Sequence, residues 1–133
     1  MNDSIDHETL KAELDRFRAT VTGVTHVLAV ASDGILLAST SSLDRDQAER
    51  VAAASSGFCG LARQVNEDVG GKGVRAVCVE MSVGSLFIIE TSGGARLAAA
   101  IVAGSDTSNV LYQLGQLAPK VGAKALTMAA RRG

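Results

Sequence analysis

The chain has few aromatic residues, a single proline, two cysteines and no excess of charge of either sign. Aromatic residues make up 3% of its 133 residues although hydrophobic residues make up 47%. The apolar bulk is therefore alanine, valine and leucine, which predicts a thin, closely packed core of mixed helices and strands. The net charge of −1 argues against a nucleic-acid binder that relies on a broad basic surface. The length predicts a single domain over residues 1–133.

The cysteines and the lengths of the apolar runs exclude further classes of protein. Cys59 and Cys78 form neither a metal-binding spacing nor a disulfide framework, and their apolar neighbours predict two small core residues. No apolar run reaches the length of about 18 residues that a membrane span needs. The acidic, polar start does not resemble a signal peptide. A cytoplasmic protein without direct membrane insertion is expected.

The first third of the chain predicts a helix followed by a hairpin. Ser4 or Asp6 is expected to cap the helix and Gly23 to end it, around the apolar stripe Leu10, Leu14, Phe17 and Val21. Residues 24–31 and 35–40 read as two strands. The turn at 32–34 contains Gly34, which can adopt positive φ.

Residues 43–69 predict a long helix capped by Asp44, with Gln47 completing a capping box. One expected stripe toward the sheet is Val51, Ser55, Phe58, Ala62, Val65 and Val69. The other sides are also small or apolar, whereas a surface helix normally carries charge there. We expect a second molecule to cover this side, because an exposed alanine-rich helix is the weaker interpretation for a segment with two internal glycines.

Three strands at 74–81, 85–91 and 97–103 predict an antiparallel meander. The last two are apolar on both faces, so helices should cover both sides of the sheet. The strand 74–81 carries Arg75 and Glu80 on opposite faces and otherwise apolar residues, as expected for an edge strand able to pair with another chain. The glycine cluster 70–73 precedes a strand rather than a helix, which favours a plain turn over a phosphate loop.

A last helix is expected after its cap Asp106, with a kink or an end at Pro119. The core of the domain is therefore expected to span about residues 6–118, with 119–133 as a helical extension or tail.

No catalytic, cofactor or metal site is predicted. His7 is expected to be a solvated helix residue and His26 a satisfied sheet residue, since neither has a partner at a metal-ligand or triad spacing. The charged residues at the start of the long helix, Asp44 to Arg50, are most economically a solvated surface.

The order of elements resembles the Roadblock/LC7 family over essentially the whole chain. The resemblance rests on the hairpin segment 33–39, the long small-residue helix with Phe58 and Leu61, the segment 85–89, and the segment 109–111. It is closest to the bacterial MglB-like branch, which includes small proteins encoded beside Ras-like GTPases in actinobacteria.

The resemblance implies an α/β, profilin-like fold of topology αββαβββα. Its five-stranded antiparallel sheet has the order 2-1-5-4-3, with the first and last helices on one face and the long helix on the other. It also implies a homodimer in which the third strands pair and the long helices pack together. Some bacterial members stimulate GTP hydrolysis by reshaping the switch regions of the GTPase without inserting an arginine finger.

The expected homodimer contacts lie on the edge strand and the long helix: Val74, Ala76, Val77, Cys78, Val79, Ala53, Gly57, Gly60 and Leu61. Arg50, Arg63 and Gln64 are candidate contacts for a GTPase. In a twofold strand pair one residue faces its own copy, and Val77 and Cys78 are the candidates. A charged residue or proline at Val77 should break the dimer.

The predicted function is a non-catalytic homodimeric regulator or adaptor of a small Ras-like GTPase, with no nucleic acid as partner. A histidine-kinase-like, membrane-associated assembly stays open as a further partner. The alternative is a profilin-like ligand-sensing module without a GTPase partner, although the small side chains offer no obvious ligand cage. An enzyme is the third and weakest class.

Overall fold

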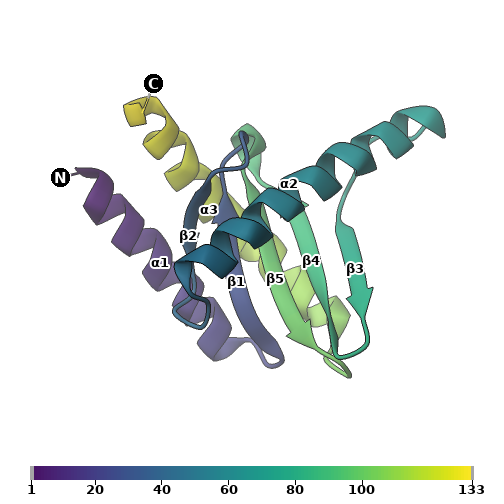
Figure 1. Ribbon diagram of the computed structural model, residues 1–133, viewed down its shortest axis with the longest axis horizontal. Coiled ribbons are helices and arrows are strands. Elements are labelled where there is room, and N and C mark those ends of the chain that lie inside the picture. Colours follow the sequence, from purple (N-terminus) through teal and green to yellow (C-terminus); the bar gives the residue numbers. More distant parts are fainter. Residues whose placement is uncertain (1, 133) are drawn as a thin grey trace.

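Five strands form one antiparallel sheet in the order 2-1-5-4-3, and three long helices cover its two faces (Figure 1). The computed structural model describes the backbone of residues 2–132 and the side chains of residues 6–130. The elements are α1 (Asn2–Thr20), β1 (Val24–Val30), β2 (Leu36–Ser39), α2 (Arg45–Asp68), β3 (Val77–Met81), β4 (Gly84–Glu90), the short 3-10 helix η1 (Ser92–Gly94), β5 (Arg96–Val102) and α3 (Thr107–Arg132). The predicted fold class, strand order and meander are confirmed; Met1 and Gly133 of the predicted domain lie outside the described residues.

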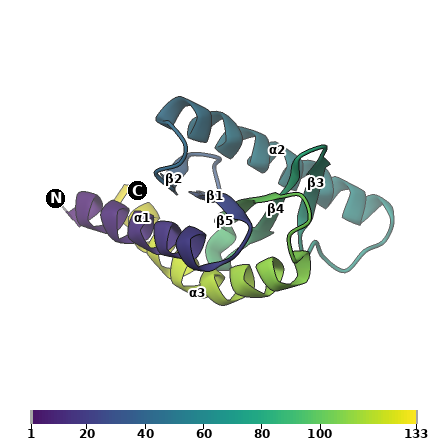
Figure 2. The same ribbon diagram turned by 90° about the horizontal axis from the view of Figure 1, so that it is seen from below.

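The sheet separates two hydrophobic cores. Figure 2 shows α1 and α3 on one face and α2 on the other. The larger core joins the predicted stripe of α1, including Leu10 and Leu14, to Phe87 and to Val110 and Leu114 of α3. The smaller core joins α2 to the opposite face, as expected for central strands that are apolar on both sides.

The start of α1 differs from the prediction. The helix already includes Ser4 and Asp6, so neither caps it. Asp6 is instead a buried side chain whose Oδ1 lies 3.7 Å from Nζ of Lys124 on α3. An ion pair between two packed helices therefore accounts for the acidic residue that looked like a cap.

The sheet-facing side of α2 also differs from the prediction. Its buried residues are all small: Ala48, Ala52, Ser55 and Cys59. Of the predicted stripe only Ser55 belongs to this set. Phe58, Val65 and Val69 are 38%, 59% and 75% exposed, because they lie on a flank of the helix that the sheet does not cover. Small residues facing the sheet let α2 pack closely against β1 and β2.

The local signals in the turns and caps are confirmed. Gly34 adopts a φ of +89° in the β1–β2 turn. Asp44 and Gln47 form both hydrogen bonds of the capping box at the start of α2. Asn109 donates its backbone N–H to Oδ1 of Asp106 at 3.1 Å, which caps α3.

Two boundaries move. The strand β3 begins at Val77 rather than at residue 74, since its pairing with β4 starts with Val77 and Ile88. The helix α3 does not end at Pro119 but runs to Arg132. Val121 and Ala125, beyond the proline, are buried in the larger core, so the core extends past the expected limit of residue 118.

Candidate interaction surface

The outer edge of β3 presents unpaired backbone groups. The strand pairs with β4 on one side, and among the described residues no strand pairs with its other side. The two-residue loop at 82–83 requires Met81 and Gly84 to be a hydrogen-bonded pair. Since bonded and non-bonded pairs alternate, Val77 and Val79 direct their N–H and C=O groups toward β4. The corresponding groups of Cys78 and Glu80 therefore point outward.

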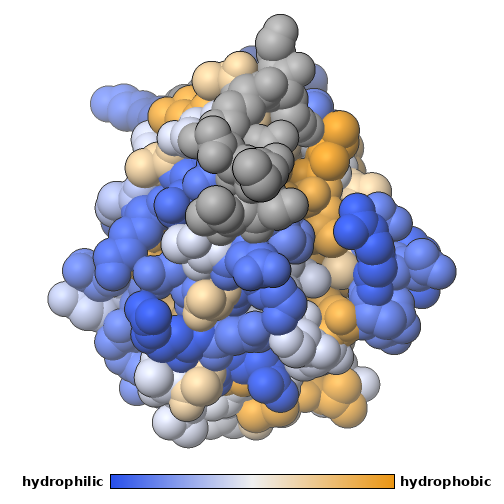
Figure 3. Space-filling model, turned by 90° about the vertical axis from the view of Figure 1, so that its left-hand side faces the viewer, coloured by the Kyte–Doolittle hydropathy of each residue, from blue (hydrophilic) through white to orange (hydrophobic). Residues whose placement is uncertain are grey.

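The opposite edge of the sheet, β2, is covered by α1. The Nδ1 of His7 lies 2.9 Å from the carbonyl oxygen of Leu37, and Asp15 accepts the backbone N–H of Ser41 at 3.0 Å. The expectation that His7 is simply solvated is therefore wrong: it is half-buried and occupies an acceptor of the edge strand. Figure 3 shows this side of the molecule, which is mostly hydrophilic.

The helix α2 extends beyond β3. In Figure 1 it crosses the sheet diagonally, and its C-terminal part projects past the edge strand. A flank of this helix carries large apolar side chains, among which Leu61 is 67% and Val65 59% exposed. An open groove of about 610 Å³ lies between this part of α2 and the segment that returns to β3, lined by Ala62, Val65, Asn66, Gly73, Val74, Arg75 and Ala76.

The sheet next to the exposed flank is also incompletely covered. Val79 and Leu86 are opposed on the face that carries α2 and are only partly buried. Met81 and Val102 are 51% and 46% exposed. Since side chains two residues apart share a face, Met81 continues the row of Val79. The flank of α2 and this part of the sheet therefore form one apolar surface.

The predicted interface residues fall in three places. On the strand side, Val74, Ala76 and Cys78 are exposed, whereas Val77 and Val79 are partly buried. Leu61 lies on the apolar flank of α2. Ala53, Gly57 and Gly60 are exposed and lie roughly opposite the buried residues of α2 around the helix, so they point away from the sheet. No atom lies within 4 Å of a Cβ built on either glycine.

The two cysteines differ. Cys59 is buried as predicted, but Cys78 is exposed, so the expectation of two core cysteines is wrong for Cys78. Its side chain lies on the same face as that of Phe87, directly opposite on β4. Burial raises the pKa of the Cys59 thiol although Arg96 lies beside it, which makes this thiol a poor nucleophile at neutral pH.

The candidate GTPase contacts are partly engaged within the protomer. Arg63 donates to Glu90 at 2.8 Å, and Gln64 donates to Asp68 at 3.1 Å. Arg50 is exposed on the first half of α2. The structure therefore does not bring these three residues together in one site.

Arg96, which the sequence did not single out, anchors α2 to the sheet. It is 5% exposed and donates from Nη1 to the carbonyl oxygen of Ser32 at 3.1 Å and to Oγ of Ser56 on α2 at 3.5 Å. Its Nη2 lies 4.0 Å from Glu90, the partner of Arg63. The sequence signal that could have identified Arg96 is its charge at the start of an otherwise apolar strand.

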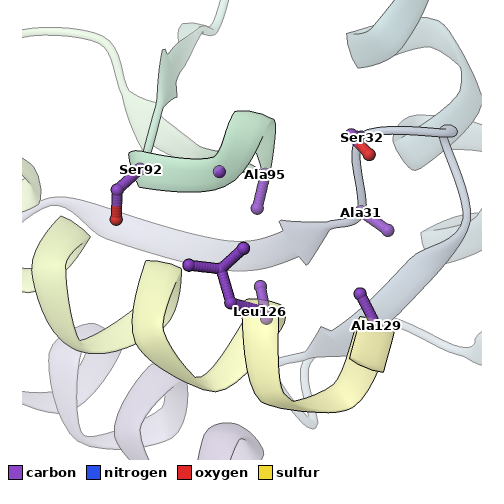
Figure 4. A pocket seen from close by; sticks show the side chains of 8 residues that line it. Ala31, Ser32, Ser92, Ala95, Leu126 and Ala129 are labelled. Atoms are coloured by element: carbon purple, nitrogen blue, oxygen red, sulfur yellow. The ribbon is translucent and has the colours of Figure 1, made fainter. Parts of the chain in front are cut away.

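The space enclosed between η1 and the C-terminal part of α3 is too small for a metabolite. Figure 4 shows the space where Leu126 of α3 points toward η1 and the β1–β2 turn. It measures about 30 Å³, which leaves room for about two water molecules. Within the described residues no group of three or more His, Cys, Asp or Glu side chains is placed to hold a metal ion. None of the helices described between residues 2 and 132 has the length and apolar character needed to cross a bilayer.

Comparison with known proteins gives a consistent result. A family model described as the Roadblock/LC7 domain matches residues 10–102. A crystal structure of a Roadblock/LC7 domain from Streptomyces avermitilis is 27% identical, with a TM-score of 0.79, and the match covers 84% of this chain and 92% of that one. A search of curated proteins found no significant match.

Two more distant structures share the fold. Myxococcus xanthus MglB is 13% identical with a TM-score of 0.78, over 92% of this chain and 91% of that one. Profilin II of Acanthamoeba castellanii is 15% identical with a TM-score of 0.60, over 86% and 98%. The fold is therefore profilin-like.

Proposed function

The chain belongs to the Roadblock/LC7 family, and from this premise we propose that it is a non-catalytic, homodimeric regulator or adaptor of a small Ras-like GTPase. The observation that carries the proposal is the open edge of β3 beside the uncovered apolar flank of α2. A protomer with such a surface exposes a strand edge that native proteins normally cover, and a second copy supplies matching groups.

The strand part of the proposed interface is an antiparallel pair of two β3 strands. Cys78 and Glu80 provide the outward N–H and C=O groups, and Val74, Ala76, Val77 and Val79 complete the contact. If the twofold axis passes beside Cys78, the two copies of Cys78 form a hydrogen-bonded pair. If it passes beside Val77, the two copies of Val77 form a non-hydrogen-bonded pair. Each new backbone bond contributes about 1 kcal/mol.

The helix part follows from the same twofold axis. Because α2 projects past β3 on one side of the axis, the helix of the second copy projects over the first protomer by the same amount. It would lie against the flank with Phe58, Leu61 and Val65 and over the partly exposed Met81 and Val102. Gly57 lies one helical turn before Leu61 and borders this contact, whereas Ala53 and Gly60 face the outer side of the helix pair, where close approach of a further helix is possible.

The GTPase is proposed to dock on the face that carries the two α2 helices, with Arg50, Arg63 and Gln64 as contacts. Engaging Arg63 would require exchanging its ion pair with Glu90 for a pair with the partner, and such exposed pairs contribute little. Regulation would then act through the conformation of the GTPase rather than through an active site of this chain.

A pull-down with GDP-loaded and GTP-loaded forms of a Ras-like GTPase encoded beside this chain tests the proposal. We expect capture that depends on the bound nucleotide and weakens in Arg63→Glu. Equal capture of both forms, or none, would contradict regulation of that GTPase. A metabolite that raises the melting temperature in its absence would instead support the ligand-sensing alternative. The same assay with a kinase-containing membrane assembly would test that further partner.

A further inference from the structure

A second candidate site lies at the β2 edge, on the opposite side of the sheet from β3. A pocket of about 150 Å³ opens between α1, β2 and the first turn of α2. Its walls are formed by His7, Lys11, Leu36, Ala38, Ser39, Thr40, Ser41, Leu43 and Arg45. Two side chains of α1, His7 and Lys11, and Arg45 at the start of α2 thus border a hydroxyl-bearing loop, around a space large enough for a tetrahedral oxyanion.

We propose that this pocket binds a phosphate group. Arg45 and Lys11 would supply charge-assisted hydrogen bonds, which are the stronger kind, and the hydroxyl of Ser39 would complete the set. Arg45 is the first residue of α2, whose N-terminal end is already capped by the carboxylate of Asp44, so the contribution of α2 to the pocket is the guanidinium of Arg45.

The neighbouring carboxylates are already engaged. Lys11 lies 2.9 Å from Oδ2 of Asp15, while Asp15 also accepts from the backbone N–H and the hydroxyl of Ser41. Lys11 itself donates to the Ser41 hydroxyl at the pocket wall. A phosphate would therefore join an existing network in which the lysine still has a donor to give.

Arg45 is the adaptable member of the site. Its side chain is 75% exposed, and its Nε lies 3.5 Å from Glu49, which is a weak surface contact. Turning the guanidinium from Glu49 toward the pocket costs little. His7 is fixed at the rim, because its Nδ1 must carry a proton to donate to the carbonyl of Leu37.

The phosphate could be free orthophosphate or the phosphate of a small monoester. A ¹H–¹⁵N NMR titration with orthophosphate and, separately, with O-phosphoserine distinguishes the two, at ionic strength held constant with sodium chloride. We expect saturable shifts confined to residues 7–11 and 39–45. Tighter binding of O-phosphoserine would identify a monoester site, and equal binding a site for the phosphate itself.

Variants locate the binding. Arg45→Gln and Lys11→Gln should each weaken it about tenfold, as expected for loss of one charge-assisted bond of about 1.4 kcal/mol. Arg50→Gln removes the same charge from the same helix outside the pocket and should leave binding unchanged. Shifts that are absent, spread over the surface, or equally weakened in Arg50→Gln would overturn the proposal. The site shares no residue with β3, so its failure would leave the proposed dimer and GTPase role untouched.

Discussion

His26 of β1 shows how a single side chain adjusts to the sheet. Its Nδ1 lies 2.7 Å from the hydroxyl of Ser42, and the ring is partly buried. Burial lowers the pKa of His26 below its ordinary value of 6.5, and the nearby Arg18 lowers it further. Folding therefore favours the neutral imidazole.

The sign of the resulting pH dependence follows from linkage. Because the pKa of His26 is lower in the folded state, the unfolded chain binds more protons as the pH falls below about 6.5. The stabilising contribution is present above that pH and is lost as the pH falls through the folded-state pKa. Urea unfolding at pH 7.5, 6.5 and 5.5 should show a smaller loss of stability in His26→Gln than in the unmodified chain. Equal losses would contradict this role.

Asp15 titrates in a separate range. Burial alone would raise its pKa, but hydrogen bonds from Lys11 and Ser41 outweigh this and lower the pKa below 3.8. The contribution of Asp15 to the free energy of unfolding is lost only at more acidic pH. It therefore does not affect the measurement on His26.

At the scale of elements, the start of α2 depends on its capping box. Asp44→Ala removes the acceptor for the backbone N–H of Gln47, which lies 2.8 Å away, and should lower the free energy of unfolding by about 1 kcal/mol. Asp46→Ala is the matched control. It removes a carboxylate from the same turn but no cap, so only the small dipole contribution is lost. Similar losses in urea unfolding of both variants would contradict a specific role for the cap.

The two exposed sides of α2 can be separated by substitution. Leu61→Asp places a charge on the apolar flank and should weaken dimerisation by about 3 kcal/mol, with little effect on the protomer because Leu61 is 67% exposed. Gly60→Ala fills open space on the outer side and should stabilise the helix by up to about 1 kcal/mol. Sedimentation equilibrium measures association for both variants. A dimer weakened by Gly60→Ala but not by Leu61→Asp would reverse the assignment.

The sequence predicted the elements better than their surroundings. The alternation of apolar and polar residues, the turn glycines and the cap at Asp44 are local signals. They were sufficient to predict the individual strands, the hairpin at Gly34 and the start of α2. The edge position of the third strand was predicted from Arg75 and Glu80 among apolar residues; β3 is an edge strand, but of the two charges only Glu80 lies within it. The strand order itself came from the family resemblance.

The covered face of α2 could not be read in the same way. Both Ala52 and Phe58 lie on apolar stripes, and periodicity does not say which neighbour covers which stripe. The sheet covers the small residues, which leaves the large ones exposed in the protomer. Likewise, Cys78 has an apolar sequence context, but its burial depends on whether β3 is at the edge.

At the scale of the whole molecule, the two sheet edges are treated differently. Side chains of α1 bond to backbone groups of the β2 side, at Leu37 and Ser41, whereas β3 presents the outward groups of Cys78 and Glu80. The sheet can therefore extend through β3. The apolar flank of α2 lies on the same side, so one association would cover both surfaces.

Proline substitutions at the edge have different consequences at adjacent positions. Val77→Pro should break the dimer as the sequence predicted, but it also removes an N–H that points to β4 within the protomer. Cys78→Pro removes only an outward donor, and proline is tolerated at such edge positions. Cys78→Ser retains the donor and is the matched control.

Sedimentation velocity of the unmodified chain, Cys78→Pro and Cys78→Ser at tens of micromolar tests the central claim most directly. We expect twice the 13.6 kDa chain mass for the unmodified chain and for Cys78→Ser, and the mass of a folded single chain for Cys78→Pro. A single-chain mass for the unmodified protein, or an intact dimer in Cys78→Pro, would contradict it.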